Sequence, residues 1–484
     1  MSAWIEMASE HGGSHLSWKL DRPKPALPDS FFWTWDHSTN WVLDDPGLQV
    51  DGCYNSYLKR PGTFIEDYRR LTDMASGLGI PGIVIWGFLR DSHGGIASAK
   101  RVADHAAQRN VAILPGFGTT WYGGAYYEGD HPASLDTFLR NHPDAVMLAR
   151  DGKPYEYHGI RGACPAHPAY QEWLQGAIAW LFREFEIGGL NIENGDFLED
   201  FHPLTQAQRS SWPQDDPEPF FFQGLSYRQA LMAVPVPLEN ALVAYATYTG
   251  FQYTDAGVSQ DAGMGKSPPA MLRILPRQSV CQWTLSGMLL AKPLPLSAYL
   301  DDGVPAAAFD NPNWPSGLRL PEGGSRHVGF VHQGSQWRGS RYCCILSTIK
   351  EACLRSFRTG LSGVSIHGEV SSRLVPAALN YLAFSHFIHW PEDSLRDFGR
   401  KTLGAVLGSE RDGEDFIEVM ARCDSGDITD EVRKLADPAS HGFGGVVCGY
   451  LGRDIIAFQR YGFWRWLSQA VAAGSVRDSG RLPV

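Results

Sequence analysis

One segment of the chain places two acidic side chains at the end of a short apolar run. Asn191 and Glu193 alternate with Leu190 and Ile192, and Asp196 follows just beyond them. Because alternate side chains of a strand share one face, we expect Asn191 and Glu193 to point to the same side. A carboxylate at the C-terminal end of a strand can act as an acid, a base or a nucleophile. The segment therefore predicts chemistry on a bond such as a glycosidic one.

Cleavage of a glycosidic bond requires a second carboxyl group on the other side of that bond. The partner candidates are Glu369, which follows the apolar segment 364–367, and Asp196. Each acid also has a purely structural interpretation. Glu193 could be a buried acid bonded to an arginine, Asp196 an Asx-turn or helix N-cap residue, and Glu369 an acid near a helix start. The catalytic hypothesis rests on Glu193, Glu369 and Asp196, with the second member of the pair left open.

Polar and aromatic residues also gather near the ends of the other expected strands. Flat aromatic rings with a polar tip suit the faces of sugar rings, although large aromatic residues also fill protein cores. Trp35 is one such ring, and Arg90 and Arg161 leave room for an acidic sugar, although loop arginines more often pair with surface acids. The predicted substrate-binding residues are Asp36, His37, Trp86, Arg90, His93, Trp121, Tyr122, Asn191, Trp337 and His367.

Four histidines, His37, His93, His332 and His367, fall near expected strand ends. They lie on different strands, and neither an H-E-x-x-H nor an H-x-H motif is present, so we favour hydrogen bonding to sugar hydroxyls over a metal site. A Ser/His/Asp hydrolase is disfavoured because the sequence has no G-x-S-x-G motif. Nucleotide folds lose support because no Walker A motif and no G-x-G-x-x-G after the first strand occur. No metal and no cofactor are predicted.

The order of elements brings these residues to one end of a barrel. Strands and helices alternate, and the continuous apolar strand 82–88 is typical of a parallel strand buried on both faces. Eight such units predict an α/β fold, a (β/α)8 TIM barrel over 29–375, with a doubly wound open sheet as the alternative. Strands are expected at 31–35, 82–88, 111–115, 189–193, 242–248, 279–284, 327–331 and 364–367, and helices at 63–78, 96–109, 168–186, 225–233 and 341–358.

The flanking segments and the composition narrow the class of protein. Residues 1–28 are expected to form an irregular N-terminal extension, and helical periodicity predicts a C-terminal helical domain over 376–484. The chain has 484 residues, is 43% hydrophobic and carries a formal net charge of −11, which favours a globular protein and disfavours nucleic acid as a partner. Its apolar runs are too short to cross a bilayer. The expected partner is a carbohydrate, and a homodimer is left open.

The cysteines and the first residues bear on location. Eight scattered cysteines form no C-x-x-C pair, which favours buried thiols in a reducing compartment. The segment 1–6 contains an acid and no apolar core of a secretory signal. A cytoplasmic location is therefore expected.

Two segments resemble the (β/α)8 glycoside hydrolases. In the first, Cys164-Pro165-Ala166-His167-Pro168 precedes an amphipathic helix and the strand that ends at Glu193. A similar segment leads to the catalytic carboxylate in many barrel glycosidases. Gly188 replaces an Asp of that pattern, and Glu193 replaces the Asp at the end of the strand. The resemblance implies a catalytic role for Glu193.

The second segment joins Gly368-Glu369 to the helical pattern at 379–384 and to 390–393. It is similar to the junction between barrel and helical domain in α-glucuronidase-like and β-hexosaminidase-like barrels. The His-x-Gly-Gly-Asp-Glu motif of true β-hexosaminidases is absent from the fourth strand, so their substrate-assisted mechanism is not implied.

Together these features predict an exo-acting glycoside hydrolase. Glu193 is expected to be the general acid/base or the nucleophile, with Glu369 or Asp196 as its partner. Two other classes stay open. One is a sugar-acid lyase or isomerase on the same barrel, with His93 or His367 as the base. The other is a carbohydrate-binding barrel without catalytic activity.

Overall fold

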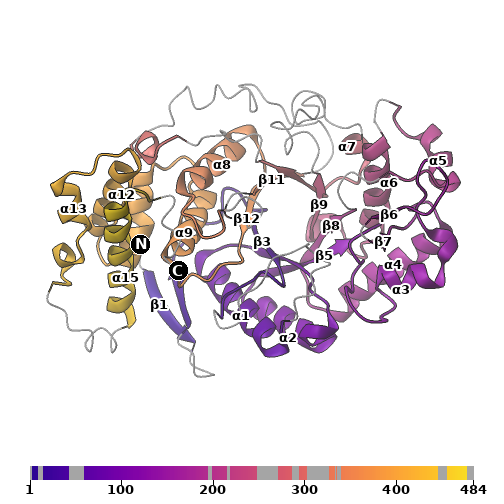
Figure 1. The fold of residues 1–484 in the computed structure, drawn as a ribbon, viewed down its shortest axis with the longest axis horizontal. Coiled ribbons are helices and arrows are strands. Elements are labelled where there is room, and N and C mark those ends of the chain that lie inside the picture. The colour runs from indigo at the N-terminus through magenta and orange to yellow at the C-terminus, as the bar shows by residue number, and fades with distance from the viewer. Residues whose placement is uncertain are drawn as a thin grey trace.

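In the computed structural model the chain is a barrel with helices on its flanks (Figure 1). Two predicted site residues, Asp196 and Trp337, lie outside the described residues. The structure describes residues 3–8, 15–42, 59–157, 159–194, 199–214, 218–247, 271–285, 294–301, 326–332, 334, 340–444 and 455–476.

Eight parallel strands close into one ring, in the order β10-β11-β12-β3-β4-β5-β8-β9. The ring includes the pairing of the last strand with the first, in which Ser365 lies opposite Phe31 and His367 opposite Trp33. This closure confirms the predicted (β/α)8 barrel and excludes the doubly wound open sheet. The strands are β3 (Phe31–Trp35), β4 (Gly82–Trp86), β5 (Ala112–Gly118), β8 (Gly189–Glu193), β9 (Leu242–Thr247), β10 (Val280–Thr284), β11 (Arg326–Val331) and β12 (Gly363–His367).

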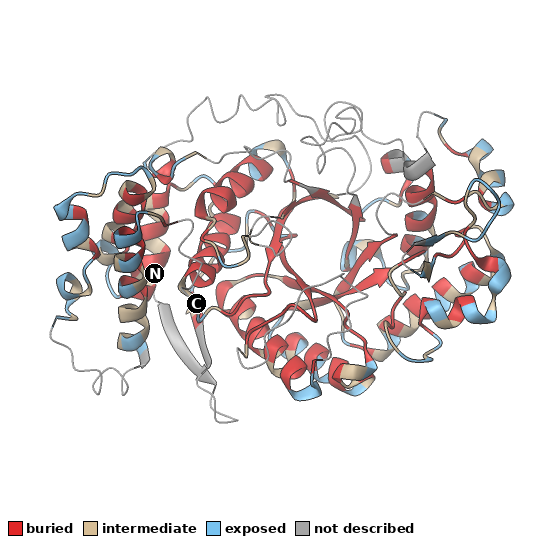
Figure 2. Cartoon of the chain, viewed as in Figure 1, coloured by how far each residue is buried: buried red, intermediate tan, exposed pale blue. Residues whose placement is uncertain are grey.

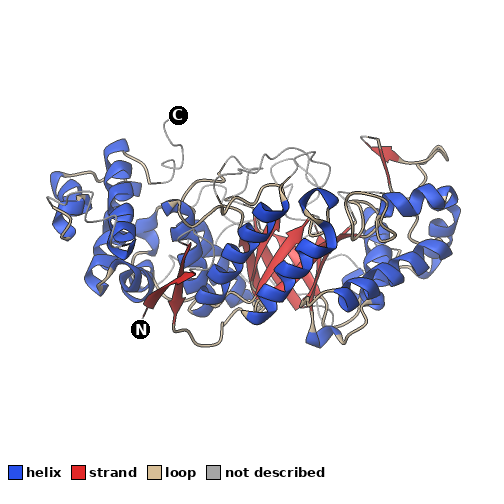
Figure 3. Cartoon of the chain, turned by 90° about the horizontal axis from the view of Figure 1, so that it is seen from below, coloured by secondary structure: helices blue, strands red, loops and turns tan. Residues whose placement is uncertain are grey.

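Helices connect successive strands and cover the outside of the ring, and Figure 3 shows the strands enclosed between them. Helix α1 illustrates the local signals: Pro61 stands in its first turn, and Gly79, with a φ of +68°, ends it. The main helices are α1 (Pro61–Leu78), α2 (Gly95–Gln108), α4 (Pro168–Glu184), α6 (Glu218–Ala233), α7 (Met271–Ile274), α8 (Leu346–Thr359) and α9 (Val375–His389). Smaller elements are α3 (Leu135–Asn141), β6 (Glu156–Tyr157), β7 (Ile160–Arg161) and α5 (Pro203–Gln208).

Helix α8 begins at Leu346, so the predicted start at Arg341 was wrong. The preceding Ile345 makes no side-chain capping hydrogen bond, and the sequence therefore carries no N-cap signal at the true start. As a result Arg341 lies in the loop between β11 and α8. In a barrel of this kind that loop belongs to the C-terminal end of the strands.

The expectation that residues 1–28 are irregular was wrong in part. Two antiparallel strands, β1 (Ala3–Ala8) and β2 (His15–Leu20), form a hairpin whose second strand lies against α1. Gly77 permits this approach, because a Cβ there would lie 1.9 Å from the carbonyl oxygen of Trp18. The indole of Trp18 is 1% exposed and contacts Phe463 edge to face. The hairpin thus depends on distant contacts and not on local sequence signals.

The C-terminal part is helical, as predicted. The barrel's last helix, α9, packs against α8 and β12, and the boundary predicted at 375/376 stays a prediction. In Figure 1 the helices that follow lie beside the barrel, next to the hairpin. They are α10 (Leu395–Phe398), a π-helical turn (Gly399–Leu403), α11 (Gly404–Leu407), α12 (Glu410–Asp424), α13 (Asp430–Ala436) and α15 (Ile455–Ala473).

The inside of the ring is filled by buried side chains. Figure 2 shows that the strands of the ring are coloured as buried along their length. At the centre of the ring the amide oxygen of Asn191 accepts the indole N–H groups of Trp33 (3.3 Å) and Trp86 (2.8 Å). The amide nitrogen of Asn191 donates to Gln282 (2.8 Å), whose own nitrogen donates to Ser365 (3.2 Å). The amide nitrogen of Asn191 also donates to the carbonyl oxygen of Ala244 on β9 (3.4 Å), so one hydrogen-bonded network joins six of the eight strands across the interior.

The composition predicted free cysteines and no membrane-spanning segment, and both can be compared with the described residues. Among these, Cys164, Cys281, Cys343, Cys344, Cys353 and Cys423 are free thiols. In the same part of the chain, no helix combines the length and the apolar character needed to cross a membrane.

We predict that Asn191→Leu destabilises the protein by about 3–5 kcal/mol, because it leaves two indole N–H groups and the Gln282 carbonyl without buried partners. Equilibrium unfolding in urea measures the change in the free energy of unfolding. The control Asn141→Leu, at the exposed end of α3, should change it by no more than about 0.5 kcal/mol. Equal effects of the two substitutions would show that the network contributes little.

Candidate active site

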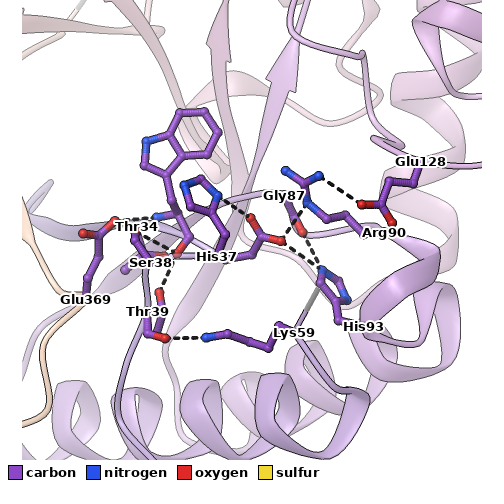
Figure 4. Close-up of polar contacts among 12 residues, drawn as sticks. Thr34, His37, Ser38, Thr39, Lys59, Gly87, Arg90, His93, Glu128 and Glu369 are labelled. Atoms are coloured by element: carbon purple, nitrogen blue, oxygen red, sulfur yellow. Dashed lines mark hydrogen bonds and ion pairs between the residues drawn. The ribbon is translucent and has the colours of Figure 1, made fainter. Parts of the chain in front are cut away.

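Asp36, just past the end of β3, is the centre of a buried charge cluster, and Figure 4 shows its partners His37, Arg90 and His93. Its carboxylate pairs with the guanidinium of Arg90 at 2.7 Å and lies 3.3 Å from His37 Nδ1 and 3.5 Å from His93 Nε2. Arg90 also forms an ion pair with Glu128, with 3.3 Å between Arg90 Nη1 and Glu128 Oε1. Burial alone would raise the pKa of Asp36, but the charge of Arg90 and the hydrogen bond to His37 outweigh it and hold that pKa well below its usual range. Asp36 is therefore a fixed negative charge and not a proton donor.

The loop after β4 is shaped to receive this carboxylate. Gly87 has a φ of +80°, and a Cβ there would lie 2.1 Å from the Asp36 Oδ1 atom. The carbonyl oxygen of Gly87 lies 2.8 Å from His93 Nε2, and the imidazole stacks flat on Phe64 with 3.7 Å between ring centroids. Burial lowers the pKa of His93. A neutral His93 that donates to Gly87 therefore holds the loop in place.

Glu369 follows β12 and is 1% exposed. Its Oε1 atom accepts hydrogen bonds from the backbone N–H of Trp35 (2.9 Å) and the hydroxyl of Ser38 (2.5 Å). Its Oε2 atom is also buried and has no hydrogen-bond partner in the part of the chain that the structure describes. Buried carboxylate oxygens are normally satisfied, so an oxygen without a partner indicates a position that a ligand or water completes. One oxygen of Glu369 is thus fixed and the other is available.

Glu193 is the last residue of β8 and is 3% exposed. Asn191 points into the ring, so strand alternation directs Glu193 to the same side, towards the mouth of the barrel. Leu190 and Ile192 belong to the core outside the ring, as the sequence predicted. The carbonyl oxygen of Glu193 accepts hydrogen bonds from the N–H (2.7 Å) and the hydroxyl (3.1 Å) of Thr119, which tie this strand end to β5.

The ring order places the two glutamates on opposite sides. Counting from β12 through β3, β4 and β5, β8 is the fourth strand along a closed ring of eight. Glu369 and Glu193 therefore rise from opposite walls of the mouth, with the Asp36 cluster on the wall between them. Carboxyl groups carried by opposite strand ends of one ring are candidates for the pair that glycoside hydrolysis requires.

Aromatic rings cover part of the mouth. Trp35 lies 5.4 Å from the rings of His37 and Trp86, at the last position of β3. Tyr122 is half-buried, with its ring 4.8 Å from Trp121 and 5.9 Å from Trp86. Its φ of +58° is unusual for a bulky residue, and such strain is found at functional sites. Trp35 is buried and Tyr122 is half-buried, and a sugar-binding role for either ring stays a prediction.

The structure gives the other predicted binding residues different environments. Trp86 and Asn191 bond to each other inside the ring, where their polar atoms are already used. Trp121 packs with Met147 and Phe222. His367 lies at the mouth between Trp33 and Phe330 and is described further below. None of these assignments has been tested, and each stays a prediction.

The four histidines form two separate pairs and not one cluster. His37 and His93 both face Asp36, whereas His332 and His367 lie 6.1 Å apart on the opposite side of β3. Within the described ranges, no three His, Cys, Asp or Glu side chains are grouped so that they could hold a metal ion. Sequence reasoning missed Ser38 and Arg341, two residues of this region. Ser38 lies two positions after Asp36 in the same strand-end turn, and that proximity was the available signal.

The sequence and the structure of the chain can both be compared with those of known proteins. No protein-family model matches the chain, and no curated protein matches its sequence. Solved structures align over about three quarters of the chain. They include a maltogenic α-amylase from Thermotoga neapolitana, which is 11% identical. That alignment covers 75% of this chain and 77% of that chain, with a TM-score of 0.40. An α-amylase from Geobacillus thermoleovorans is 10% identical. The alignment covers 77% of this chain and 80% of that chain, with a TM-score of 0.42.

A GH20 exo-β-N-acetylglucosaminidase from Vibrio harveyi aligns with 10% identity over 76% of this chain and 55% of that chain, with a TM-score of 0.41. All three are glycoside hydrolases. At these identities and TM-scores the alignments assign no residue and no substrate, so the function is argued from the site itself.

The Asp36 cluster gives a prediction about pH. The pKa of Asp36 is lower in the folded protein than the value of about 3.9 in an unfolded chain. The carboxylate therefore contributes stability that is complete above about pH 4 and is lost as the pH falls towards the folded pKa. We expect Asp36→Asn to cost about 3 kcal/mol at pH 7 and less at pH 3.

Urea unfolding of the wild type and Asp36→Asn at pH 7 and pH 3 measures both differences. The control Asp104→Asn, at an exposed position of α2, should change stability little at either pH. A cost of Asp36→Asn that is equal or larger at pH 3 would contradict the assignment of Asp36 as a fixed charge.

Proposed function

We propose that the protein is a glycoside hydrolase that uses Glu193 and Glu369 as its two catalytic carboxyl groups. The observation that carries this proposal is their placement, since both are buried acids at the ends of opposite strands of one closed ring. Glycoside hydrolysis requires a carboxyl group on either side of the scissile bond. The arrangement supplies such a pair without any metal or cofactor.

The surroundings of the two glutamates suggest different roles. Trp35 and Ser38 fix Oε1 of Glu369 and leave Oε2 for a substrate or a water molecule, which suits a nucleophile or a general base. Glu193, on the opposite wall, is then the general acid that protonates the leaving oxygen. Asp36 stays ionised beside Arg90 and orients the strand-end loop between them.

The substrate is proposed to be the end of a saccharide chain. Trp35 and Tyr122 present rings at the mouth, which supports contact with the face of a sugar. Asp36, Glu193 and Glu369 are each no more than 3% exposed. Such burial suits a closed pocket that admits one chain end better than an open groove along which a chain lies. Exo action on an oligosaccharide or polysaccharide follows from this.

A sugar-acid lyase or isomerase with a histidine base has less support. His93 lies within hydrogen-bonding distance of Gly87 and is stacked on Phe64. Neither nitrogen of His367 has a hydrogen-bond partner among the residues that the structure describes, but burial and then the charge of Arg341 lower its pKa to about 3. A general base works best with a pKa near the working pH, so His367 is a weak base here.

We predict that Glu193→Gln and Glu369→Gln each lower kcat/KM about 10²–10⁴-fold on whichever sugar the wild type hydrolyses, because each removes one carboxyl group of the pair. The measurement is a screen of aryl glycosides and natural oligosaccharides with wild type and both variants. Glu172→Gln, on the exposed face of α4, is the matched control and should keep full activity.

Thermal unfolding of each variant checks that lost activity is not lost folding. Turnover that survives either substitution would move the chemistry to another acid. Binding of sugars by the wild type without turnover of any would instead indicate the carbohydrate-binding barrel.

A further inference from the structure

A pocket lies beside the candidate active site, where the start of α9 and the loop before α8 meet the end of β12. Its volume is about 20 Å³, which is room for a small polar group such as a carboxylate and not for a whole sugar ring, and its lining includes Arg341, Ile345, His367, Val370, Asn380 and Tyr381. Ser38 links this pocket to Glu369, because its carbonyl oxygen accepts a hydrogen bond from Arg341 and its hydroxyl donates one to Glu369. The question is which chemical group this pocket is built to receive.

Arg341 is a cation in this pocket without an acidic partner among the described residues. Its Nη2 atom donates to the carbonyl oxygen of Ser38, and its buried Nε atom has no hydrogen-bond partner. Arg90 and Arg355, two other buried arginines, each pair with a carboxylate at 2.7 Å. A guanidinium prefers a carboxylate that accepts two of its N–H groups. Among the described residues, therefore, no anion is paired with Arg341, which is able to bind one.

His367 is a second polar group in the pocket with unused capacity. Its side chain is nearly buried, with 7% of the residue exposed, and neither ring nitrogen has a hydrogen-bond partner within the described ranges. Burial and Arg341 lower its pKa to about 3, so the ring is neutral at pH 7 and offers one N–H donor and one acceptor. It can donate to an anion or bond a sugar hydroxyl.

The remaining polar groups restrict the kind of anion. Asn380 is used by the backbone of Ile345 (2.8 Å) and of Cys343 (3.0 Å), and the Tyr381 hydroxyl donates to Val370 (2.6 Å). Arg341 therefore supplies the one positive charge among these lining residues, and Glu369 is a negative charge next to them. A singly charged carboxylate fits this balance better than a phosphate dianion.

We propose that this pocket binds the carboxylate of an acidic sugar, so that the substrate of the site is a uronic acid glycoside. Arg341 is the carboxylate-binding residue, and His367 contributes a hydrogen bond. The sequence had suggested Arg90 and Arg161 for an acidic sugar, but Arg90 is bound to Asp36 and Glu128, and Arg161 pairs with Glu156 on an exposed strand. This proposal rests on the proposed glycosidase function for its substrate, but the binding step can be tested alone.

The test is calorimetric titration of wild type, Arg341→Gln and Arg341→Lys with glucuronate, galacturonate, glucuronamide, glucose and inorganic phosphate. We expect a uronate to bind the wild type at least tenfold more tightly than glucuronamide, which has the same shape without the charge. Arg341→Gln should weaken uronate binding about ten- to hundredfold, and Arg341→Lys less. Arg161→Gln is the matched control and should bind as the wild type does.

Equal affinity for glucuronate and glucuronamide would overturn the proposal, and so would uronate binding that Arg341→Gln leaves unchanged. Tighter binding of phosphate than of either uronate would overturn it as well. If Arg341→Gln does not fold, the comparison of ligands on the wild type still decides.

Kinetics separate this proposal from the proposed function. Hydrolysis of neutral aryl glycosides but of no aryl uronide would overturn the carboxylate pocket and leave the glycosidase standing. Uronate binding that depends on Arg341, without turnover of any glycoside, would support the pocket and overturn the glycosidase.

Discussion

Closure of eight parallel strands into one ring is the constraint on which the site depends. It is the pairing of β12 with β3 that brings Glu369, near the end of the barrel sequence, next to Trp35 and Ser38 near its beginning. The same closure sets Glu193 on the opposite wall. Asn191 and the indoles that bond to it fill the interior beneath the mouth, so the geometry of the strand ends follows from a satisfied buried network.

Much of the barrel could be predicted from the sequence, because buried parallel strands are continuous apolar runs and the helices between them have strong periodicity. β3 was predicted to the residue, and β4 to within two. The hairpin β1–β2 was missed because the close approach of Trp18 to Gly77 stabilises it, and no local pattern reveals such a contact. The start of α8 was misplaced because Ile345 provides no side-chain cap.

The site was only partly predictable from the sequence. The role of a charged residue depends on its ion-pair partners, and these partners come together only in the folded chain. Arg90 and Arg341 are both arginines near strand ends, yet one is neutralised by Asp36 and Glu128 and the other faces a pocket without an acid among the described residues. The hydrogen-bond partners of Asn191 also could not be predicted from the sequence. Strand alternation gave its direction correctly, but only the structure shows that Trp33, Trp86 and Gln282 use its amide.

The central claim is that a glycosidic bond lies between Glu193 and Glu369. The most direct measurement is a crystal structure of Glu193→Gln with a bound oligosaccharide that the wild type hydrolyses. The account predicts the glycosidic oxygen within about 2.6–3.2 Å of the side chain at position 193 and the Glu369 carboxylate on the other side of the same sugar. A saccharide bound in the barrel mouth with its scissile bond beyond the reach of both groups would contradict it.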